Sequence, residues 1–357
     1  MTKPLIVIAA GGTGGHMFPA QALAEEMLDR GWRVRLSTDE RGARYATGFP
    51  DAVERHVLSA GTFARGGLSK LVAPFQIFAG VISAIVAMRR DRPACVAGFG
   101  GYPAFPAMMA AWLLGRPRLV HEQNGVLGKV NEVFARRVDR VACGTWPTKL
   151  PDGITGVHTG NPVRSAIAKQ AGAPFDFPED GAINVLVLGG SQGAAILSRV
   201  VPFALSALPP ILRIRMKVSH QARAEDHDTV VATYRQSGIE ADVSPFFSDV
   251  PERLVNAHLV ISRSGASTVA DIAAIGRPSI LVPLAIAKRD EQTANARGLV
   301  AVGAATLLTE AEFESDRVSA EVLAILQDGK RAATMAVAAR EQGKPDAARS
   351  LADLVET

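Results

Sequence analysis

The fold is decided by two stretches, LIVIAAGGTGGH at residues 5–16 and NVLVLGGSQGA at residues 184–194. In each of them an apolar run of strand length leads directly into a glycine-rich turn, and a helical pattern follows the turn. Gly11 and Gly189, which open the two turns, lie about half a chain length apart in this chain of 357 residues. This spacing predicts two α/β halves of similar design, each starting with a strand, a glycine turn and a helix.

Short apolar runs alternate with helical patterns in both halves. The expected strands are residues 5–10, 33–37, 95–98, 119–121 and 141–143, followed by residues 184–189, 215–218, 242–246, 259–262 and 279–283. The expected helices include residues 19–29, 194–208 and 268–275. Continuous apolar strands that alternate with helices are typical of parallel sheets covered on both faces. The predicted fold class is therefore α/β, with two Rossmann-like, doubly wound parallel-sheet domains facing across a deep cleft that would hold the ligand.

The domain boundary is expected near the middle of the chain. We place an N-terminal domain at residues 1–162 and a C-terminal domain at residues 163–340, and expect a helix at about residues 341–357 that can pack back on the first domain. Residues 169–181 (KQAGAPFDFPEDG) are rich in proline, glycine and alanine. This composition is typical of a linker region.

Composition and charge exclude several classes of protein. Hydrophobic residues make up 48% of the chain and charged residues 21%, which excludes a disordered or fibrous protein. A net charge of +4 is compatible with phosphates or anionic lipids as partners, but it is too small and too dispersed to favour a nucleic acid. Cys95 and Cys143 have no CxxC spacing, so the sequence indicates neither a disulfide framework nor a zinc site.

Residues 71–88 form an uncharged stretch of eighteen residues, which is just long enough to be considered as a membrane span. Proline, glycine and polar residues interrupt the stretch, and basic residues flank it on both sides. We therefore interpret residues 70–92 as a helix that lies on an anionic membrane surface, with Phe75 and Phe78 facing outward. The alternative is an ordinary amphipathic helix that covers the sheet.

The glycine turns have the composition of anion-binding turns. In GGTGGH (residues 11–16), the N–H groups of the turn and of the following helix would face a ligand at the carboxyl edge of the sheet. The turn matches neither the dinucleotide fingerprint nor the P-loop, which disfavours NAD and ATP. GGSQG (residues 189–193) adds a hydroxyl and an amide, and fits a diphosphate. GFGGYP (residues 98–103) is a third glycine cluster. The alternative is that these glycines serve steric needs only.

Polar residues that follow predicted strands are the candidates for chemistry. His16 could accept a proton from a sugar hydroxyl, or it could simply be a packing residue. The run HEQN (residues 121–124) could line the site, or it could be a solvated loop with a helix cap at Asn124. Asp271, expected in the first turn of a helix, could bind ribose hydroxyls or satisfy the helix dipole. The amide side chains of the run DEQTAN (residues 290–295) could bind the hydroxyl groups of a sugar, or the run could be a capped helix start.

Seven motifs carry a resemblance to a known family: GGTGGHMFPA, GFGGYPAFPA, HEQNGVLGKVN, TGNPVR, LGGSQGA, RSGASTVAD and DEQTANA. In this order they resemble the MurG family, the inverting glycosyltransferases of the GT-B fold that make lipid II for peptidoglycan. The resemblance spans nearly the whole chain. It implies transfer of GlcNAc from UDP-GlcNAc to the C4 hydroxyl of undecaprenyl-diphospho-MurNAc-pentapeptide (lipid I), with neither a metal nor another cofactor. It also implies a peripheral protein on the cytoplasmic face of the bacterial inner membrane, and it is compatible with contacts to other cell-wall synthesis proteins.

The resemblance also assigns the site residues. His16 would be the catalytic base, and the acceptor would lie against Gly14, Gly101 and Tyr102. The backbone of Phe247 would face the uracil. The full set of UDP-GlcNAc contacts that the resemblance implies is Thr13, Gly14, Gly15, Asn124, Arg164, Ser191, Gln192, Phe247, Ser264, Gly265, Ala266, Ser267, Thr268, Asp271, Gln292 and Asn295.

Two departures from the family pattern affect the donor site. Asp271 stands where the family usually has a glutamate, and Glu291 stands at a position that is commonly neutral or basic. Two other functions remain open from the sequence: a UDP-GlcNAc 2-epimerase of the same fold, and a non-catalytic protein that binds a nucleotide sugar or a lipid. Release of UDP that depends on a lipid acceptor would distinguish the transferase from both.

Overall fold

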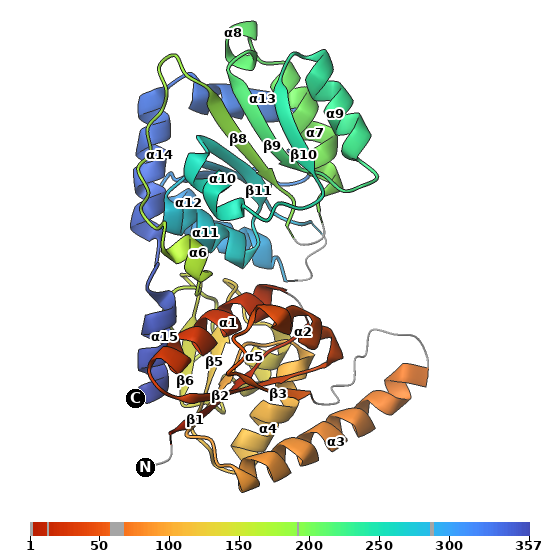
Figure 1. The fold of residues 1–357 in the computed structure, drawn as a ribbon, viewed down its shortest axis with the longest axis vertical. Coiled ribbons are helices and arrows are strands. Elements are labelled where there is room, and N and C mark those ends of the chain that lie inside the picture. Colours follow the sequence, from red (N-terminus) through yellow and green to blue (C-terminus); the bar gives the residue numbers. More distant parts are fainter. Residues whose placement is uncertain (1–2, 13, 58–67, 191–192, 286–288) are drawn as a thin grey trace. The chain divides into compact units, whose positions relative to one another are not determined.

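The computed structural model describes residues 3–12, 14–57, 68–190, 193–285 and 289–357. The chain divides into two compact units, each built around its own parallel sheet (Figure 1). Unit 1 comprises Met1–Ser165 together with Pro345–Thr357, and unit 2 comprises Ala166–Lys344. The prediction of two Rossmann-like α/β domains is thereby confirmed.

Unit 1 contains a seven-stranded sheet in which all paired neighbours are parallel. Across the sheet the order is β3 (Glu54–Val57), β2 (Arg33–Thr38), β1 (Leu5–Ala9), β4 (Cys95–Gly98), β5 (Arg118–Glu122), β6 (Arg140–Cys143) and β7 (Gly156–His158). The strand order reverses at β1, which pairs with β2 on one side and with β4 on the other. Ligands of such sheets bind at the carboxyl ends of the strands beside this reversal, where the GGTGGH and GFGGYP turns begin.

Alternate residues of β1 face the two helical layers of unit 1. Ile6 and Ile8 share one apolar core with residues of α1 (Gly14–Asp29) and α15 (Ala347–Glu356). Val7 belongs to the core on the other face. That core is shared with α3 (Leu68–Arg90), α4 (Phe105–Leu113) and α5 (Lys129–Phe134). This alternation follows from the two-residue period of a strand.

The C-terminal helix α15 belongs to unit 1. Leu351, Ala352 and Val355 join the core formed by β1 and α1. On the rim of this core, Arg30 forms ion pairs with Asp353 and Glu356, both at 2.7 Å. Unit 1 therefore combines two separate parts of the chain, and all of unit 2 lies between them in the sequence.

Unit 2 contains a six-stranded sheet, also parallel. Its order is β10 (Glu240–Ser244), β9 (Met216–Gln221), β8 (Ile183–Leu188), β11 (Leu259–Arg263), β12 (Ser279–Val282) and β13 (Ala305–Leu307). The helices around it are α7 (Ala195–Ser206), α8 (Pro210–Arg213), α9 (His227–Gln236), α10 (Val250–Asn256), α11 (Ala266–Ile275), α12 (Glu291–Ala301), α13 (Ser315–Leu326) and α14 (Gly329–Gln342). The strand order reverses at β8, which the second glycine turn follows.

Residues 169–181 are held on unit 2, unlike the linker that the sequence predicts. The buried guanidinium of Arg277 donates to the carbonyl oxygens of Ala173 at 3.2 Å and Pro174 at 2.9 Å. Arg215 donates to the carbonyl oxygens of Pro178 and Gly181. These hydrogen-bond partners fix the proline- and glycine-rich segment on unit 2 as firmly as a regular element. The chain therefore passes between the units earlier, at the helix α6 (Ser165–Ala168).

Three strands lie outside the sequence expectation. β3 and β7 are edge strands with partly exposed residues, and β13 has only three residues at the other sheet's edge. An edge strand buries little surface, so its sequence need not be apolar. α1 begins at Gly14 and α11 at Ala266, both earlier than expected, because the last residues of each glycine or serine motif already form the first helical turn.

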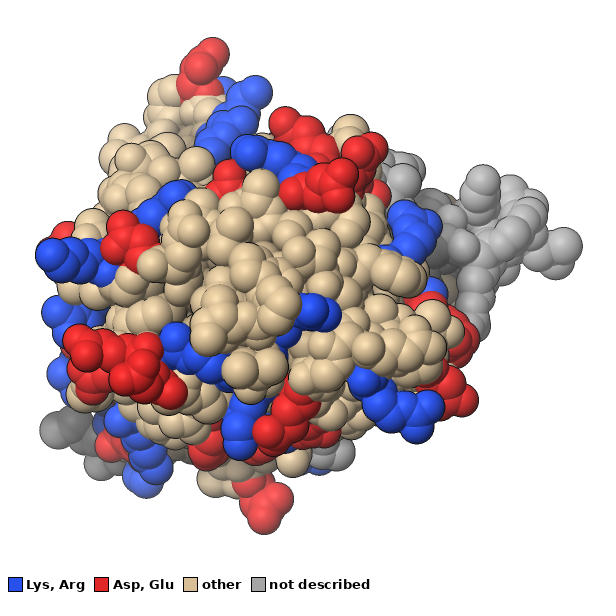
Figure 2. Space-filling model, turned by 90° about the horizontal axis from the view of Figure 1, so that it is seen from above, with Lys and Arg blue, Asp and Glu red and all other residues tan. Residues whose placement is uncertain are grey.

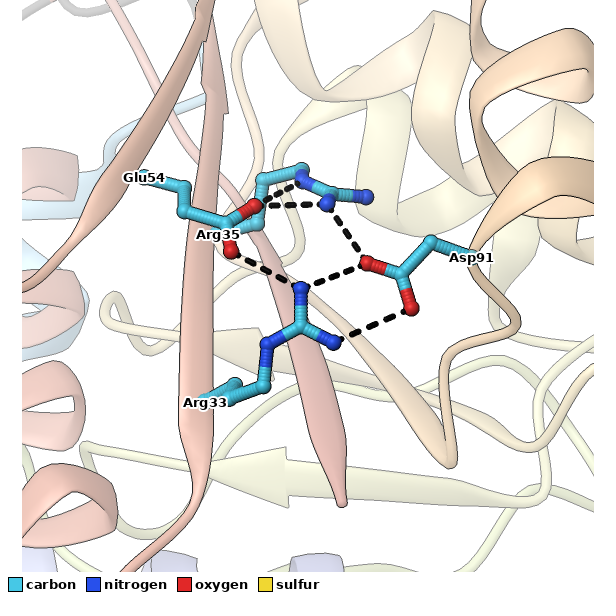
Figure 3. Close-up of polar contacts among 4 residues, drawn as sticks. All are labelled: Arg33, Arg35, Glu54 and Asp91. Carbon is cyan, nitrogen blue, oxygen red and sulfur yellow. Dashed lines mark hydrogen bonds and ion pairs between the residues drawn. The ribbon is translucent and has the colours of Figure 1, made fainter. Parts of the chain in front are cut away.

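An ionic network ties the end of α3 to the sheet of unit 1 (Figure 3). Asp91, just beyond α3, pairs with Arg33 at 2.7 Å and Arg35 at 2.8 Å, and Glu54 of β3 pairs with the same two arginines. Hydrogen bonds from Arg33 and then from Arg35 lower the pKa of Asp91 and of Glu54.

No helix in the described part of the chain is long and apolar enough to cross a membrane.

Figure 2 views the end of unit 2 that carries α8. On this face an uncharged centre is surrounded by Lys and Arg side chains intermixed with Asp and Glu side chains. The large apolar side chains exposed around α7 and α8 are Phe203, Ile211 and Ile214. This face therefore has no dominant sign of charge among its described residues.

Candidate functional site

The first and third glycine clusters lie against each other at the carboxyl edge of unit 1. Gly101 has a φ of +74°, and a Cβ atom placed on it would lie 2.9 Å from the carbonyl oxygen of Gly11. A Cβ atom on Gly11 would lie 2.6 Å from the ring of Pro103. Glycine is therefore required at both positions by close approach, and at Gly101 also by the backbone conformation. Gly14 and Gly15 begin α1 beside this contact, and Thr13 lies outside the described residues.

His16 lies in the first turn of α1 and is partly exposed. Loss of solvent around the ring lowers its pKa from 6.5 to about 4. At neutral pH the imidazole is therefore uncharged, which is the form that accepts a proton, although its basicity is lower than that of a solvated histidine. Tyr102, which is 39% exposed, follows Gly101 at the start of a short 3-10 helix (Tyr102–Ala104).

The HEQN run is largely buried, so the solvated alternative is wrong: His121 and Glu122 end β5, and Gln123 is buried directly after it. Glu122 is 1% exposed, and its Oε1 accepts hydrogen bonds from the backbone N–H and from Nδ2 of Asn124, both at 3.0 Å. Its Oε2 accepts from the backbone N–H of Gly128 at 2.7 Å and from Asn131 Nδ2 at 2.9 Å. Asn124 is not a helix cap, because α5 begins at Lys129 with Gly128 as its N-cap. Four donors therefore converge on one buried carboxylate.

The two other members of this run connect neighbouring loops. His121 Nε2 lies 3.2 Å from the carbonyl oxygen of Gly160, and Gln123 Nε2 donates to the carbonyl oxygen of Phe99 at 3.0 Å. Burial lowers the pKa of His121 to about 4 and raises the pKa of Glu122. These side chains connect the end of β5 to the GFGGYP turn and the TGNPVR segment.

Arg164 lies in unit 1, on the other side of the boundary from the domain in which the sequence places it. Its guanidinium lies over the ring of Phe18, 5.5 Å from the ring centre. Phe18 in turn contacts Gly14, since a Cβ atom on Gly14 would lie 3.0 Å from the Phe18 ring. Arg164 is thereby placed at the first glycine turn. Asn161 of the same TGNPVR motif is buried, and neither of its amide atoms has a hydrogen-bond partner among the described residues.

The turn after β8 forms the corresponding edge of unit 2. A Cβ atom on Gly189 would lie 2.6 Å from the backbone nitrogen of Ala194, and Gly190 has a φ of +79°. Ser191 and Gln192 lie outside the described residues. Gln221, which the sequence analysis missed, accepts a hydrogen bond from the N–H of Gly189 at 3.2 Å. The feature of the sequence that could have identified Gln221 is its place as a polar residue at the carboxyl end of a buried strand.

Phe247 lies in the loop between β10 and α10. Its side chain is 6% exposed, and the guanidinium of Arg253 lies 4.0 Å from the centre of its ring. The neighbouring Phe246 is 74% exposed. Because β10 and β8 are separated by β9, the Phe247 loop and the glycine turn are two strands apart on the same edge of the sheet.

The RSGAST motif surrounds the start of α11. Gly265 is the N-cap, and Ala266, Ser267 and Thr268 form the first turn, whose N–H groups have no partner within the helix. The hydroxyls of Ser264 and Ser267 are buried without a hydrogen-bond partner among the described residues. N–H groups without a partner in the helix and the hydroxyls of these two serines meet at one helix start, which is a suitable site for an anion.

Two side chains of α12 reach the neighbouring loops. Asn295 is 1% exposed and its Nδ2 donates to the carbonyl oxygen of Ser264 at 3.1 Å. Gln292 Oε1 accepts from the N–H of Leu284 at 3.0 Å.

Asp271 is 9% exposed and lies beyond the first turn of α11, so the helix-dipole explanation for this residue is wrong. Within the described ranges, no group of three or more His, Cys, Asp or Glu residues is placed to hold a metal ion.

Comparisons with known proteins identify the family. The glycosyltransferase family 28 N-terminal domain matches residues 6–143, and the glycosyltransferase family 28 C-terminal domain matches residues 184–351. The UDP-N-acetylglucosamine--N-acetylmuramyl-(pentapeptide) pyrophosphoryl-undecaprenol N-acetylglucosamine transferase of Caulobacter vibrioides is 49% identical, over 99% of this chain and 98% of that protein. The protein of the same name from Paramagnetospirillum magneticum is 48% identical, over 99% of this chain and 96% of that protein.

Solved structures agree with the sequence comparison. The crystal structure of Acinetobacter baumannii MurG matches with a TM-score of 0.81 and 31% identity, over 99% of each chain. A putative UDP-N-acetylglucosamine 2-epimerase from Listeria monocytogenes matches with a TM-score of 0.66 at 14% identity, over 98% of this chain and 94% of that chain, and shares the fold alone. The chain therefore belongs to glycosyltransferase family 28 and, within it, to the MurG family of N-acetylglucosamine transferases.

Proposed function

We propose that this protein transfers GlcNAc from UDP-GlcNAc to the C4 hydroxyl of undecaprenyl-diphospho-MurNAc-pentapeptide, with inversion at the sugar carbon and without a metal. The observation that carries the proposal is the 49% identity, over nearly the full length, to a transferase named for this reaction. Anion-binding turns at the carboxyl edges of both sheets support it, because donor and acceptor each carry a diphosphate.

The proposed donor contacts in unit 2 match the chemistry of a nucleoside diphosphate sugar. The start of α11 would meet the diphosphate with N–H groups and with the hydroxyls of Ser264 and Ser267, which have no hydrogen-bond partner among the described residues. Gln292 has its oxygen committed to Leu284, which leaves its NH₂ group to donate to a sugar hydroxyl. Asp271 would bind the ribose with a carboxylate one methylene shorter than the usual glutamate.

The proposed acceptor contacts lie in unit 1. As the C4 oxygen attacks C1 of GlcNAc, its proton would pass to the uncharged imidazole of His16. The bond between C1 and the β-phosphate oxygen breaks, and the electron pair leaves with UDP. A single in-line displacement of this kind inverts C1. Without a metal, the negative charge on UDP would be met by Arg164 and by backbone N–H groups, and losing one such donor costs about 3–4 kcal/mol of transition-state stabilisation.

We also propose that α3 attaches the protein to an anionic membrane at the cytoplasmic face. Phe75 and Phe78 are 76% and 66% exposed, whereas Ala84 and Met88 nearer the end of the helix are 2% and 3% exposed. This distribution supports a helix that is docked at one end and presents aromatic rings at the other, in place of a helix that only covers the sheet. The side chains of residues 68–73, including Lys70, lie outside the described part of the structure.

The function is tested by turnover of the purified protein with UDP-GlcNAc and lipid I. We expect release of UDP only when lipid I is present, together with formation of a disaccharide product. Conversion of UDP-GlcNAc into its C2 epimer without an acceptor and without net release of UDP would indicate epimerase chemistry. Binding of UDP with neither release of UDP nor epimerisation of the sugar under either condition would indicate a non-catalytic binding protein.

A further inference from the structure

Gln221 is the last residue of β9, the strand that lies between β8 and β10. The loops that follow β8 and β10 therefore pass on either side of it. Its Oε1 accepts from the N–H of Gly189 at 3.2 Å, and its Nε2 lies 3.2 Å from the carbonyl oxygens of both Gly190 and Pro245. One amide side chain thus bonds the glycine turn on one side and the Phe247 loop on the other.

The far end of the Phe247 loop is also tied to β9. Two residues before Gln221, and so on the same face of the strand, Ser219 Oγ accepts a hydrogen bond from Arg253 at 2.6 Å. Arg253 also pairs with Asp249 at 2.8 Å and covers the ring of Phe247. The loop is therefore held at its first residue by Gln221 and near its last by Arg253. Among the described residues, Gln221 is the side chain that hydrogen-bonds both this loop and the glycine turn.

We propose that Gln221 is a positioning residue for nucleotide recognition, which sets the spacing between the glycine turn at Gly189 and Gly190 and the loop at Pro245 to Asp249. The inference rests on the proposed function, which makes these two segments the diphosphate and base contacts of one donor site. A nucleotide that spans both segments gains affinity only when their spacing matches the distance from its base to its diphosphate. Gln221 itself does not touch the nucleotide.

The chemistry of the side chain explains why glutamine is needed. The three bonds use both N–H donors of the amide and one acceptor site on its oxygen. Glutamate could accept from Gly189 but could not donate to the two carbonyl oxygens. Asparagine is one methylene shorter and could not reach all three groups. Leucine has a similar size and would make none of the bonds.

The test is calorimetric binding of UDP and of CDP to the full chain carrying Gln221→Leu, with Gln236→Leu as the control. Gln236 is an exposed residue at the end of α9 in the same unit, so it controls for the substitution itself. We expect Gln221→Leu to weaken UDP binding about tenfold and to reduce the preference for UDP over CDP at least threefold. The control should change neither quantity, and the melting temperature of both variants should stay within a few degrees of the wild type.

A purely structural role would lower the melting temperature of Gln221→Leu and leave the preference for UDP over CDP unchanged, and this result would overturn the proposal. UDP affinity and preference within twofold of the wild type would overturn it as well. If Gln221→Leu does not fold, Gln221→Asn keeps an amide at the site and should still lose the preference; an unchanged preference in that variant would again refute the proposal. Absence of UDP binding in the wild type would instead reject the proposed function, and with it this inference.

Discussion

Asn131 Nδ2 donates to the carboxylate of Glu122 at 2.9 Å, and both side chains are 1% exposed. The same Asn131 amide lies against Gly100, where an added Cβ atom would come within 3.2 Å of it. Glu122 therefore holds the Asn131 amide, which packs against the backbone of the GFGGYP turn. This turn carries Gly101 and Tyr102, the residues proposed to meet the acceptor.

Glu122→Gln should destabilise the protein and weaken acceptor use. An amide presents one oxygen and two N–H groups, so some of the four N–H donors around residue 122 would face another donor. We expect a loss of about 3 kcal/mol in the free energy of unfolding, measured with urea, and a larger rise in KM for lipid I than for UDP-GlcNAc. Glu132→Gln, on the exposed side of α5, is the control. Unchanged unfolding would contradict the four-donor arrangement.

His16→Ala should lower turnover by about 100-fold or more, the range for a lost general base, and leave UDP binding nearly unchanged. Because the pKa of His16 is lowered to about 4, the uncharged base persists well below neutral pH. The acid limb of kcat/KM in the wild type should therefore fall off near pH 4 and not near 6.5. Turnover of His16→Ala within threefold of the wild type would make His16 a packing residue.

Asp271→Glu should keep or improve the affinity for UDP-GlcNAc, because it restores the carboxylate reach that is usual in the family. The side chain is 9% exposed, so the extra methylene must fit against the packed side of α11. Calorimetry with UDP measures the effect, and Asp271→Asn tests the charge separately. A loss of more than tenfold in Asp271→Glu would mean that the site has repacked around the shorter acid.

Replacing Phe75 and Phe78 by serine should reduce binding to vesicles that contain anionic lipid. Both rings are mostly exposed, so the melting temperature and UDP binding should hardly change. Binding by the wild type should weaken with added salt, since each basic residue near the surface contributes about 1 kcal/mol at most. Phe203→Ser, at an exposed phenylalanine of unit 2, is the matched control. A large drop in melting temperature with vesicle binding intact would place the rings in a core.

Asp91→Asn should remove a small, pH-dependent contribution to stability. The pKa values of Asp91 and Glu54 are lowered by Arg33 and Arg35, so these carboxylates stabilise the fold above their ordinary pKa values of 3.8 and 4.5. The contribution is lost as the pH falls through the lowered values. The network is partly exposed, so we expect an effect of about 1 kcal/mol at neutral pH. Urea unfolding should show that the difference between wild type and variant shrinks in acid, and a constant difference would refute this account.

The sequence alone determined the local elements. An apolar run such as Leu5–Ala9 is short and ends at a glycine turn, so a buried strand is the element that removes its side chains from water. The glycines that follow allow the turn. The order of strands and helices, the two-unit α/β architecture and the motifs of the family were therefore predictable. Edge strands such as Gly156–His158 were not, because they bury too little surface to leave a pattern.

Only the tertiary structure decided which groups meet. That Glu122 is satisfied by Asn131, that Arg164 belongs to unit 1, and that Gln221 joins two loops all depend on atoms brought together by the packed sheets. The pKa of His16 likewise follows from the protein that surrounds the ring. Periodicity records which face of an element is buried, but hydrogen-bond partners and desolvation arise between residues far apart in the chain, and no local pattern encodes them.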